Sequence, residues 1–416
     1  MTEVQSADRI YYDEPATLEF TAEVTAIREL ARVDGQQVWQ IALDRTAFYP
    51  TSGGQPYDTG VLVAKARSGA SLEVPITQVD EDDTGEVWHT TSKPLQEGTV
   101  ITGQIHAARR RDHMQQHTGQ HLLSAILDRN FGVRTVSFHL GESVSTIDLE
   151  GAALSDAQLQ SAAMEANHII AAAVPLSTRY VTREEATAML QQGLLRKLPP
   201  RSGNIRLIEI PGIDLNACGG THVATTAQIG SLLLRGTETV RGNLRLSFVC
   251  GDRALAAADT DFRTVQSLAA QLTTAPTELA HGVERMRSEN RSLQKERGTL
   301  LDEIATLEAK TLAAAGSPSL LHTVAANRDA TFAKLLAAKL VRDTNTSVAC
   351  VIANDGQRTN IVLAAKPGTL DCGTVLRTAL TSLGARGGGS AEMAQGAVPF
   401  DQKDALLQAL RPSLPV

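Results

Sequence analysis

Residues 114–127 read MQQHTGQHLLSAIL, and residues 216–224, much farther along the chain, read NACGGTHVA. Each stretch holds two residues of metal-binding type four positions apart, namely His117 with His121 and Cys218 with His222. Residues four apart share a face of a helix, so the HxxxH pair can direct two ring nitrogens at one point. Three imidazoles and one thiol form a ligand set that suits zinc.

Neither half is specific by itself, because an HxxxH pair on an apolar helix more often consists of two ordinary histidines. The two halves together are unusual in a chain with 10 histidines and 4 cysteines. Gly219 and Gly220 follow the cysteine directly and allow a tight turn with close approach of backbone or ligand. We therefore predict one Zn²⁺ per chain, held by His117, His121, Cys218 and His222.

The composition is that of an ordinary globular protein with several domains. The chain has 416 residues, more than one hydrophobic core usually serves, and 42% of them are hydrophobic while 20% are charged. No secretory signal and no apolar run of membrane-spanning length is present, and four scattered cysteines suit a reducing compartment. These features predict a cytoplasmic protein without a membrane partner.

The net charge of −7 argues against a nucleic-acid partner, but the acidity is uneven. Residues 1–100 hold 17 acidic and 7 basic residues, whereas the rest of the chain holds 29 and 32. A polyanion could contact two basic clusters, Arg109 to Arg111 and the group of Arg196, Lys197 and Arg201. A solvated surface of mixed charge explains either cluster equally well.

The chain reads as an α+β protein of four parts. Residues 1–95 show short strands between turn signals and predict a small antiparallel β-barrel. Their loop LDRTAFYPTSGGQPYDTG, residues 43–60, presents Gln55 at a tip rich in proline and glycine, with Thr46 just upstream. An irregular loop with a polar tip is the alternative.

Residues 96–251 predict a mixed α/β domain that carries the zinc site. Helical spacing begins near Ile105 and ends at Gly132, and a second helix is expected from Ser155. The run IRLIEIPGIDLNACGG, residues 205–220, is interpreted as one strand that leads into the cysteine turn.

Residues 252–315 predict a helical segment, either a hairpin or a coiled coil. Pro276 separates two helices, and the second carries a heptad seam with steps of four and three. Its members are Leu279, Val283, Met286, Asn290, Leu293, Arg297, Leu300, Ile304 and Leu307. The seam needs a partner, which is either the first helix folded back or a second copy of the chain.

Residues 316–416 predict a final α/β domain. A hairpin and a helix precede the loop GARGGGSAEMAQGAV, residues 384–398. Its glycines could form a backbone nest for phosphate, with Arg386 adding charge, or simply a flexible loop.

Four motifs in this order resemble the editing domain of alanyl-tRNA synthetase and its free-standing AlaX relatives. They are LDRTAFYPTSGGQPYDTG, MQQHTGQHLL, SFHLG with STIDL, and CGGTH, and together they cover about residues 1–250. The helical segment followed by GARGGGSAEMAQG resembles the DHHA1 domain that ends these synthetases and the long form of AlaX. Because the editing-like region starts almost at Met1, we expect a free-standing editing protein.

The resemblance implies a trans-editing hydrolase that deacylates tRNA(Ala) mischarged with serine, and in some members glycine. It implies that His117, His121, Cys218 and His222 form the zinc site, that Gln55 and Thr46 line the aminoacyl pocket, and that Arg386, Gly387, Gly388 and Gly389 contact tRNA. A homodimer through the helical segment and the DHHA1 domain is expected, and ATP binding is not. Zinc could activate water or position the aminoacyl group, and four simultaneous ligands would leave a tetrahedral ion no vacancy.

Three other functions fit single features. A non-catalytic tRNA-binding or dimerisation protein could retain this fold, although such a protein would be expected to lose at least one of the four ligands. Gly53-Gly54-Gln55 matches the GGQ tripeptide of release factors, but these do not need the metal set. A DHH-type phosphoesterase should have an aspartate-rich metal site, and Asp112-His113-Met114 is only a distant approach to one.

Overall fold

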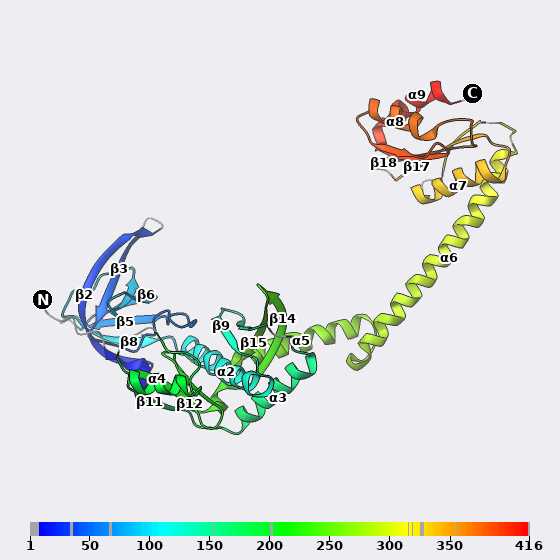
Figure 1. Ribbon diagram of the computed structural model, residues 1–416. Helices are drawn as coiled ribbons and strands as arrows, with labels where there is room; N and C mark the ends of the chain where they lie inside the picture. Colours follow the sequence, from blue (N-terminus) through cyan, green and yellow to red (C-terminus); the bar gives the residue numbers. More distant parts are fainter. Residues whose placement is uncertain are drawn as a thin grey trace. The chain divides into compact units, whose positions relative to one another are not determined.

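The computed structural model describes residues 8–33, 36–65, 69–151, 153–199, 203–314, 316–317, 319–324, 328–355 and 357–414. The chain forms two compact units, Met1–Val265 and Gln266–Val416 (Figure 1). Helix α5, Gly251–Gln271, begins in the first unit and ends in the second. Among the described residues, none of the helices combines the length and the apolar character that a bilayer crossing requires.

A closed six-stranded barrel occupies the start of the first unit and confirms the predicted antiparallel β-barrel. Its strands are β2 (Glu19–Val33), β3 (Gln36–Leu43), β5 (Gly60–Lys65), β6 (Ser71–Glu81), β7 (Val87–Thr91) and β8 (Val100–Ile105), in the order β2-β3-β7-β6-β5-β8. Alternate residues of β6 such as Val74 and Ile76 are buried, as a strand with one face toward a core requires. The barrel interior is filled by side chains, Ile41, Leu62 and Ile101 among them.

The loop that follows β3 is packed into the protein rather than exposed. Strand β4 (Arg45–Thr46) pairs in parallel with β1 (Asp8–Arg9), and the short helix α1 (Ile10–Asp13) follows β1. Ala47, Phe48 and Tyr49 are almost completely buried. The loop therefore has a fixed path between two strands of the barrel, β3 and β5.

A four-stranded sheet and two helices form the core of the second part of this unit. Helix α2 (Ala107–Phe131) ends at Gly132, which has a left-handed φ of 66°, as the sequence predicted. Helix α3 (Asp156–Ala171) begins with a capping box between Ser155 and Gln158. The sheet has the order β14-β15-β10-β9, formed by Leu232–Val240, Asn243–Cys250, Ser145–Leu149 and Thr135–Leu140.

A smaller sheet, β11-β12-β13, carries the cysteine segment. Its strands are Ser177–Val181, Ile205–Ile210 and Asp214–Ala217, with helix α4 (Arg183–Gln191) between the first two and the 3-10 helix η1 (Thr226–Ile229) beyond the third. The interpretation of residues 205–220 as a single strand was wrong. Gly212 takes a φ of 74°, and the chain turns back there so that β12 and β13 pair antiparallel.

The second unit consists of a long helix and a five-stranded sheet with flanking helices (Figure 1). The 3-10 helix η2 (Pro276–Glu278) precedes α6 (Leu279–Ala313). The sheet order is β16-β17-β18-β20-β19, formed by Ser319–Thr323, Val348–Asn354, Arg358–Ala365, Met393–Pro399 and Gly387–Gly389. The remaining elements are α7 (Ala330–Asp343), α8 (Cys372–Ser382), η3 (Phe400–Gln402), α9 (Lys403–Leu410) and η4 (Arg411–Ser413).

The glycine-rich segment near the C-terminus is a strand pair, not the loop that the sequence predicted. Gly387 to Gly389 form β19, which pairs antiparallel with β20. A Cβ atom on Gly389 would lie 2.1 Å from the Met393 carbonyl oxygen, and one on Gly387 would lie 2.3 Å from Leu380 Cδ1. Close packing of the backbone thus accounts for two of these glycines.

Most of the heptad seam of α6 faces solvent. Five of its apolar members are between 39% and 65% exposed, namely Val283, Met286, Leu293, Leu300 and Leu307. Ala305 and Ala309 pack into the core formed with α7 and the sheet, and the seam residue Ile304 is partly buried against the same core.

Candidate metal centre

Helix α2 and the turn after β13 bring the four predicted ligands together. Their ligand atoms all lie within 4.8 Å of one another, and the four residues are His117, His121, Cys218 and His222. The Cys218 Sγ atom lies 3.5 Å from His117 Nε2 and 3.3 Å from His222 Nε2. Tetrahedral zinc with Zn–N and Zn–S bonds of about 2.0 and 2.3 Å separates nitrogen from sulfur by about 3.5 Å, so the residues present fit this ion.

Glycine is required at the turn between Cys218 and His222. A Cβ atom on Gly220 would lie 2.1 Å from His117 Cε1, so any other side chain would push this ring away. The Gly220 amide donates to Cys218 Sγ at 3.4 Å, and Arg206 Nη1 donates to the carbonyl oxygens of Cys218 and Gly220, both at 2.9 Å. These bonds fix the thiol beside the imidazoles.

The cluster favours an ionised thiol. Burial would raise the pKa of Cys218, but the neighbouring imidazoles lower it well below its ordinary value. Burial lowers the pKa of His222 to about 3, which keeps this ring neutral. Burial would also lower the pKa of His121, yet Cys218 and Asp214 raise it to about 9 in the metal-free cluster. Metal binding would therefore displace a proton from His121, because only neutral imidazole is a ligand.

Each imidazole of the cluster meets a different polar partner at Nδ1. His117 Nδ1 lies 2.8 Å from Gln55 Oε1, His121 Nδ1 lies 3.0 Å from Asp214 Oδ2, and His222 Nδ1 lies 3.1 Å from Thr118 Oγ1. All three partners can accept a hydrogen bond from an Nδ1–H group. In the neutral rings the lone pairs are then on Nε2, which is the tautomer that a metal ligand needs.

Asp214 is a site residue that the sequence did not single out. Burial would raise its pKa, but His121 and Arg196 lower it overall, so it is a carboxylate. Asn216 Nδ2 donates to it at 2.6 Å, and Arg196 forms an ion pair with its other oxygen. The one signal in the sequence is an aspartate four positions before Cys218.

The two residues predicted for the aminoacyl pocket have different surroundings. Gln55 is completely buried and contacts His117, as given above. The hydroxyl of Thr46, also buried, lies 2.9 Å from His89 Nε2 and accepts from the Phe48 amide at 3.1 Å. His89 Nδ1 donates to the Ile41 carbonyl oxygen at 3.0 Å, so Nε2 accepts and the Thr46 proton points at it. The second lone pair of Thr46 Oγ1 remains as its means of binding a ligand.

The basic cluster of Arg109 to Arg111 was interpreted either as a possible polyanion contact or as a solvated surface, and neither interpretation holds for Arg110. Its side chain is 1% exposed and forms an ion pair with Asp58, which is 0% exposed. Arg109 Nε donates to the Tyr57 carbonyl oxygen at 2.9 Å, and Arg111 pairs with Asp252 at the surface. In the second cluster Arg196 is bound to Asp214, and Arg201 lies outside the described residues.

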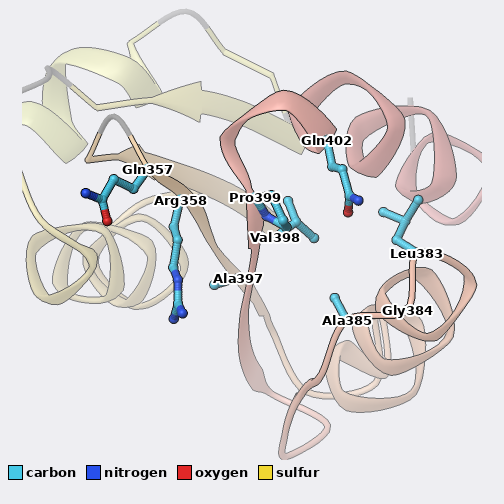
Figure 2. Close-up of a pocket in the computed structure, with 9 residues that line it drawn as sticks. All are labelled: Gln357, Arg358, Leu383, Gly384, Ala385, Ala397, Val398, Pro399 and Gln402. Atoms are coloured by element: carbon cyan, nitrogen blue, oxygen red, sulfur yellow. The ribbon is translucent and has the colours of Figure 1, made fainter.

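A cavity of about 510 Å³ lies in the second unit, at the ends of β18 and β20 (Figure 2). It is lined by Gln357, Arg358, Leu383, Gly384, Ala385, Ala397, Val398, Pro399 and Gln402. Arg386 and Gly387 to Gly389, the predicted tRNA contacts, directly follow two of the lining residues but do not line the cavity themselves. Their role in tRNA binding stays a prediction.

Two family descriptions match the first unit. "tRNA synthetases class II (A)" matches residues 1–109, and "Threonyl and Alanyl tRNA synthetase second additional domain" matches residues 205–246. The alanyl-tRNA editing protein Aarsd1-A of Xenopus laevis is 33% identical over 274 residues, which are 65% of this chain and 64% of that protein. These matches support an AlaX-type alanyl-tRNA editing protein.

The similarity extends to synthetases as well as to editing proteins. The alanine–tRNA ligase of Natronomonas pharaonis is 31% identical over 308 residues, 73% of this chain and 32% of the ligase. The chain thus spans less than two thirds of the length of these relatives. A solved C-Ala domain of Aquifex aeolicus alanyl-tRNA synthetase aligns with 23% of this chain and 87% of that domain at 21% identity, with a TM-score of 0.20.

Proposed function

We propose that the protein is a trans-editing hydrolase that deacylates tRNA(Ala) mischarged with serine, with glycine as a second amino acid. The observation that supports this most directly is the set of three buried imidazoles and one half-buried thiol, each imidazole held by its Nδ1 so that Nε2 faces the sulfur. The names of the editing relatives agree with it. Cytoplasmic location and a tRNA-binding DHHA1-like domain at residues 316–416 are part of the same proposal.

The chain's own residues would prepare the site for ester hydrolysis. His117, His121, Cys218 and His222 would hold zinc, which when bound supplies Lewis-acid chemistry toward a water molecule or the ester carbonyl group. The ionised thiol reduces the net charge of the centre, and the neutral His222 offers its nitrogen without first losing a proton. Burial of the three imidazoles keeps bulk water away from their nitrogens, which strengthens their electrostatic interactions.

A substrate panel tests the proposed activity. The wild-type protein is expected to deacylate Ser-tRNA(Ala) and Gly-tRNA(Ala) and to leave Ala-tRNA(Ala) intact, as measured by loss of the labelled amino acid from tRNA under steady-state conditions. Absence of deacylation on both mischarged substrates, with tRNA binding retained, would instead identify a non-catalytic tRNA-binding protein.

Thr46 is proposed to read the hydroxyl of the substrate serine. Its own proton is directed to His89, so its oxygen can accept a hydrogen bond from that hydroxyl. Thr46→Val removes the oxygen at nearly constant volume. We expect serine deacylation to fall by about 10-fold or more, the equivalent of one good hydrogen bond, with a smaller effect on glycine. Equal losses of kcat/KM on the two substrates would reject this role.

We also propose a homodimer through the seam of α6. The exposed apolar residues of the seam support it, as does Asn290, a polar seam residue of the kind that fixes register between paired helices. Replacing Leu293 and Leu300 by glutamate is expected to convert a dimer into a monomer in sedimentation experiments. The control is Ser288→Glu, at an exposed position off the seam. A wild-type protein that sediments as a monomer at micromolar concentration would reject the proposal.

A further inference from the structure

The turn that carries Gln55 is held in one position. Ser52 and Gln55 exchange two backbone hydrogen bonds of 3.1 and 2.9 Å across Gly53 and Gly54, which have φ values of 58° and 84°. Residues other than glycine rarely adopt this left-handed region of φ, so the two glycines make the turn possible. The Gly54 carbonyl oxygen accepts from the Leu140 amide at 3.1 Å, and this bond fixes the turn against β9.

The side chain of Gln55 is fully engaged on its acceptor side. Its Oε1 accepts from His117 Nδ1 at 2.8 Å and from the Thr221 amide at 3.2 Å, while its Nε2 donates to Thr221 Oγ1 at 2.9 Å. The Thr221 amide can only donate, so the atom it meets must be the amide oxygen rather than the nitrogen. With two bonds to one oxygen, Gln55 offers no acceptor to a substrate.

This arrangement determines the tautomer of His117. An amide oxygen only accepts, so the proton of the neutral ring resides on Nδ1 and the lone pair is on Nε2. That Nε2 atom lies 3.5 Å from the Cys218 sulfur. Through Thr221, the neighbour of His222, the same glutamine also contacts the second half of the ligand set.

We propose that Gln55 is a positioning residue of the metal centre, which holds His117 as an Nε2 ligand, and not a residue that recognises the aminoacyl group. The proposal rests on the proposed metal site. It makes the glycine turn of the barrel a part of that site, because the turn connects the two ligand segments, residues 117–121 and 218–222. Loss of Gln55 would then weaken metal binding even when no tRNA is present.

Zinc affinity of the full-length chain, measured by competition with a chromophoric chelator in the absence of tRNA, tests this. Gln55→Ala is expected to bind Zn²⁺ about 10–100-fold more weakly than wild type, the usual cost of losing an outer partner of a ligand. Gln55→Glu keeps oxygen acceptors for His117 and Thr221 and is expected to bind zinc nearly as well as wild type.

Gln116→Ala is the matched control. Gln116 is equally buried and bonds to the backbone N and O of Cys250, both at 2.9 Å, without contacting the ligands. Thermal unfolding in EDTA should show that both alanine substitutions destabilise the metal-free protein. In the chelator competition, only Gln55→Ala should bind zinc more weakly than wild type.

The same titration separates the possible failures. Wild-type zinc affinity in Gln55→Ala, together with a raised KM for Ser-tRNA(Ala), would overturn the positioning role in favour of substrate recognition. A wild-type protein that binds no zinc would overturn the metal site and this proposal with it. A wild-type protein that binds zinc but deacylates nothing would overturn the proposed function alone, and a weakened Gln55→Ala would still support the positioning role.

Discussion

Cys218→Ala is expected to lower the Zn²⁺ affinity by more than the ~100-fold that loss of an outer partner costs, and to abolish deacylation of Ser-tRNA(Ala). Cys218 supplies the one thiol among the four ligands of the cluster, and the imidazoles around it lower its pKa so that it binds as a thiolate. Without it, three neutral imidazoles would hold the ion with no anionic ligand. Chelator competition and a single-turnover deacylation assay measure the two effects.

The matched control for this variant is Cys350→Ala. Cys350 is a buried cysteine in the second unit and packs in the core of the C-terminal sheet. The Cys350→Ala protein should be somewhat less stable than wild type but should retain zinc binding and deacylation activity. A Cys218→Ala protein that kept both would show that the cluster is a group of ordinary buried side chains.

Arg110→Met is expected to lower the free energy of unfolding of the first unit by about 3–5 kcal/mol, because it leaves the Asp58 carboxylate buried without its partner. Arg110 Nε donates to Asp58 Oδ2 at 3.1 Å, and Nη1 donates to the Pro15 carbonyl oxygen at 2.7 Å. The side chains are 1% and 0% exposed. Urea denaturation followed by circular dichroism measures the loss.

Two further variants separate the buried charge from the loss of an arginine in general. The double variant Arg110→Met with Asp58→Asn removes the unpaired charge and should be more stable than Arg110→Met alone. Arg263→Met breaks an exposed ion pair with Asp259, 78% and 57% exposed, and should cost at most about 0.5 kcal/mol. If Arg110→Met lowered the free energy of unfolding no more than Arg263→Met does, the Arg110–Asp58 ion pair would not be what holds α2 to the barrel loop.

Local patterns predicted the elements whose sequences are unambiguous. The alternating strands of the barrel, the stop of α2 at Gly132 and the start of α3 at Ser155 all follow from periodicity and capping residues. The hairpin of β12 and β13 was missed because β13 is only four residues long, and the Pro211-Gly212 pair before it was not interpreted as a hairpin turn. The strand at Gly387 to Gly389 was missed because a run of glycines has no side-chain pattern, and only close packing reveals it.

The ligands were predictable, and their partners were not. Four residues of metal-binding type at helical and turn spacing stand out in the sequence and meet in the structure. Asp214 and Thr118 have no such signal, because they become partners of His121 and His222 only when separate segments pack together. Gln55 was recognised from its motif, but its contact with His117 depends on how the barrel turn is held against β9.

Metal removal and replacement test the central claim most directly. The wild-type protein is stripped with a chelator, and Ser-tRNA(Ala) deacylation is measured before and after addition of one equivalent of Zn²⁺ per chain. We predict that the stripped protein is inactive, that one equivalent restores the activity, and that Cys218→Ala stays inactive with added zinc. Full activity of the stripped protein, with residual zinc verified to be far below one per chain, would contradict the account.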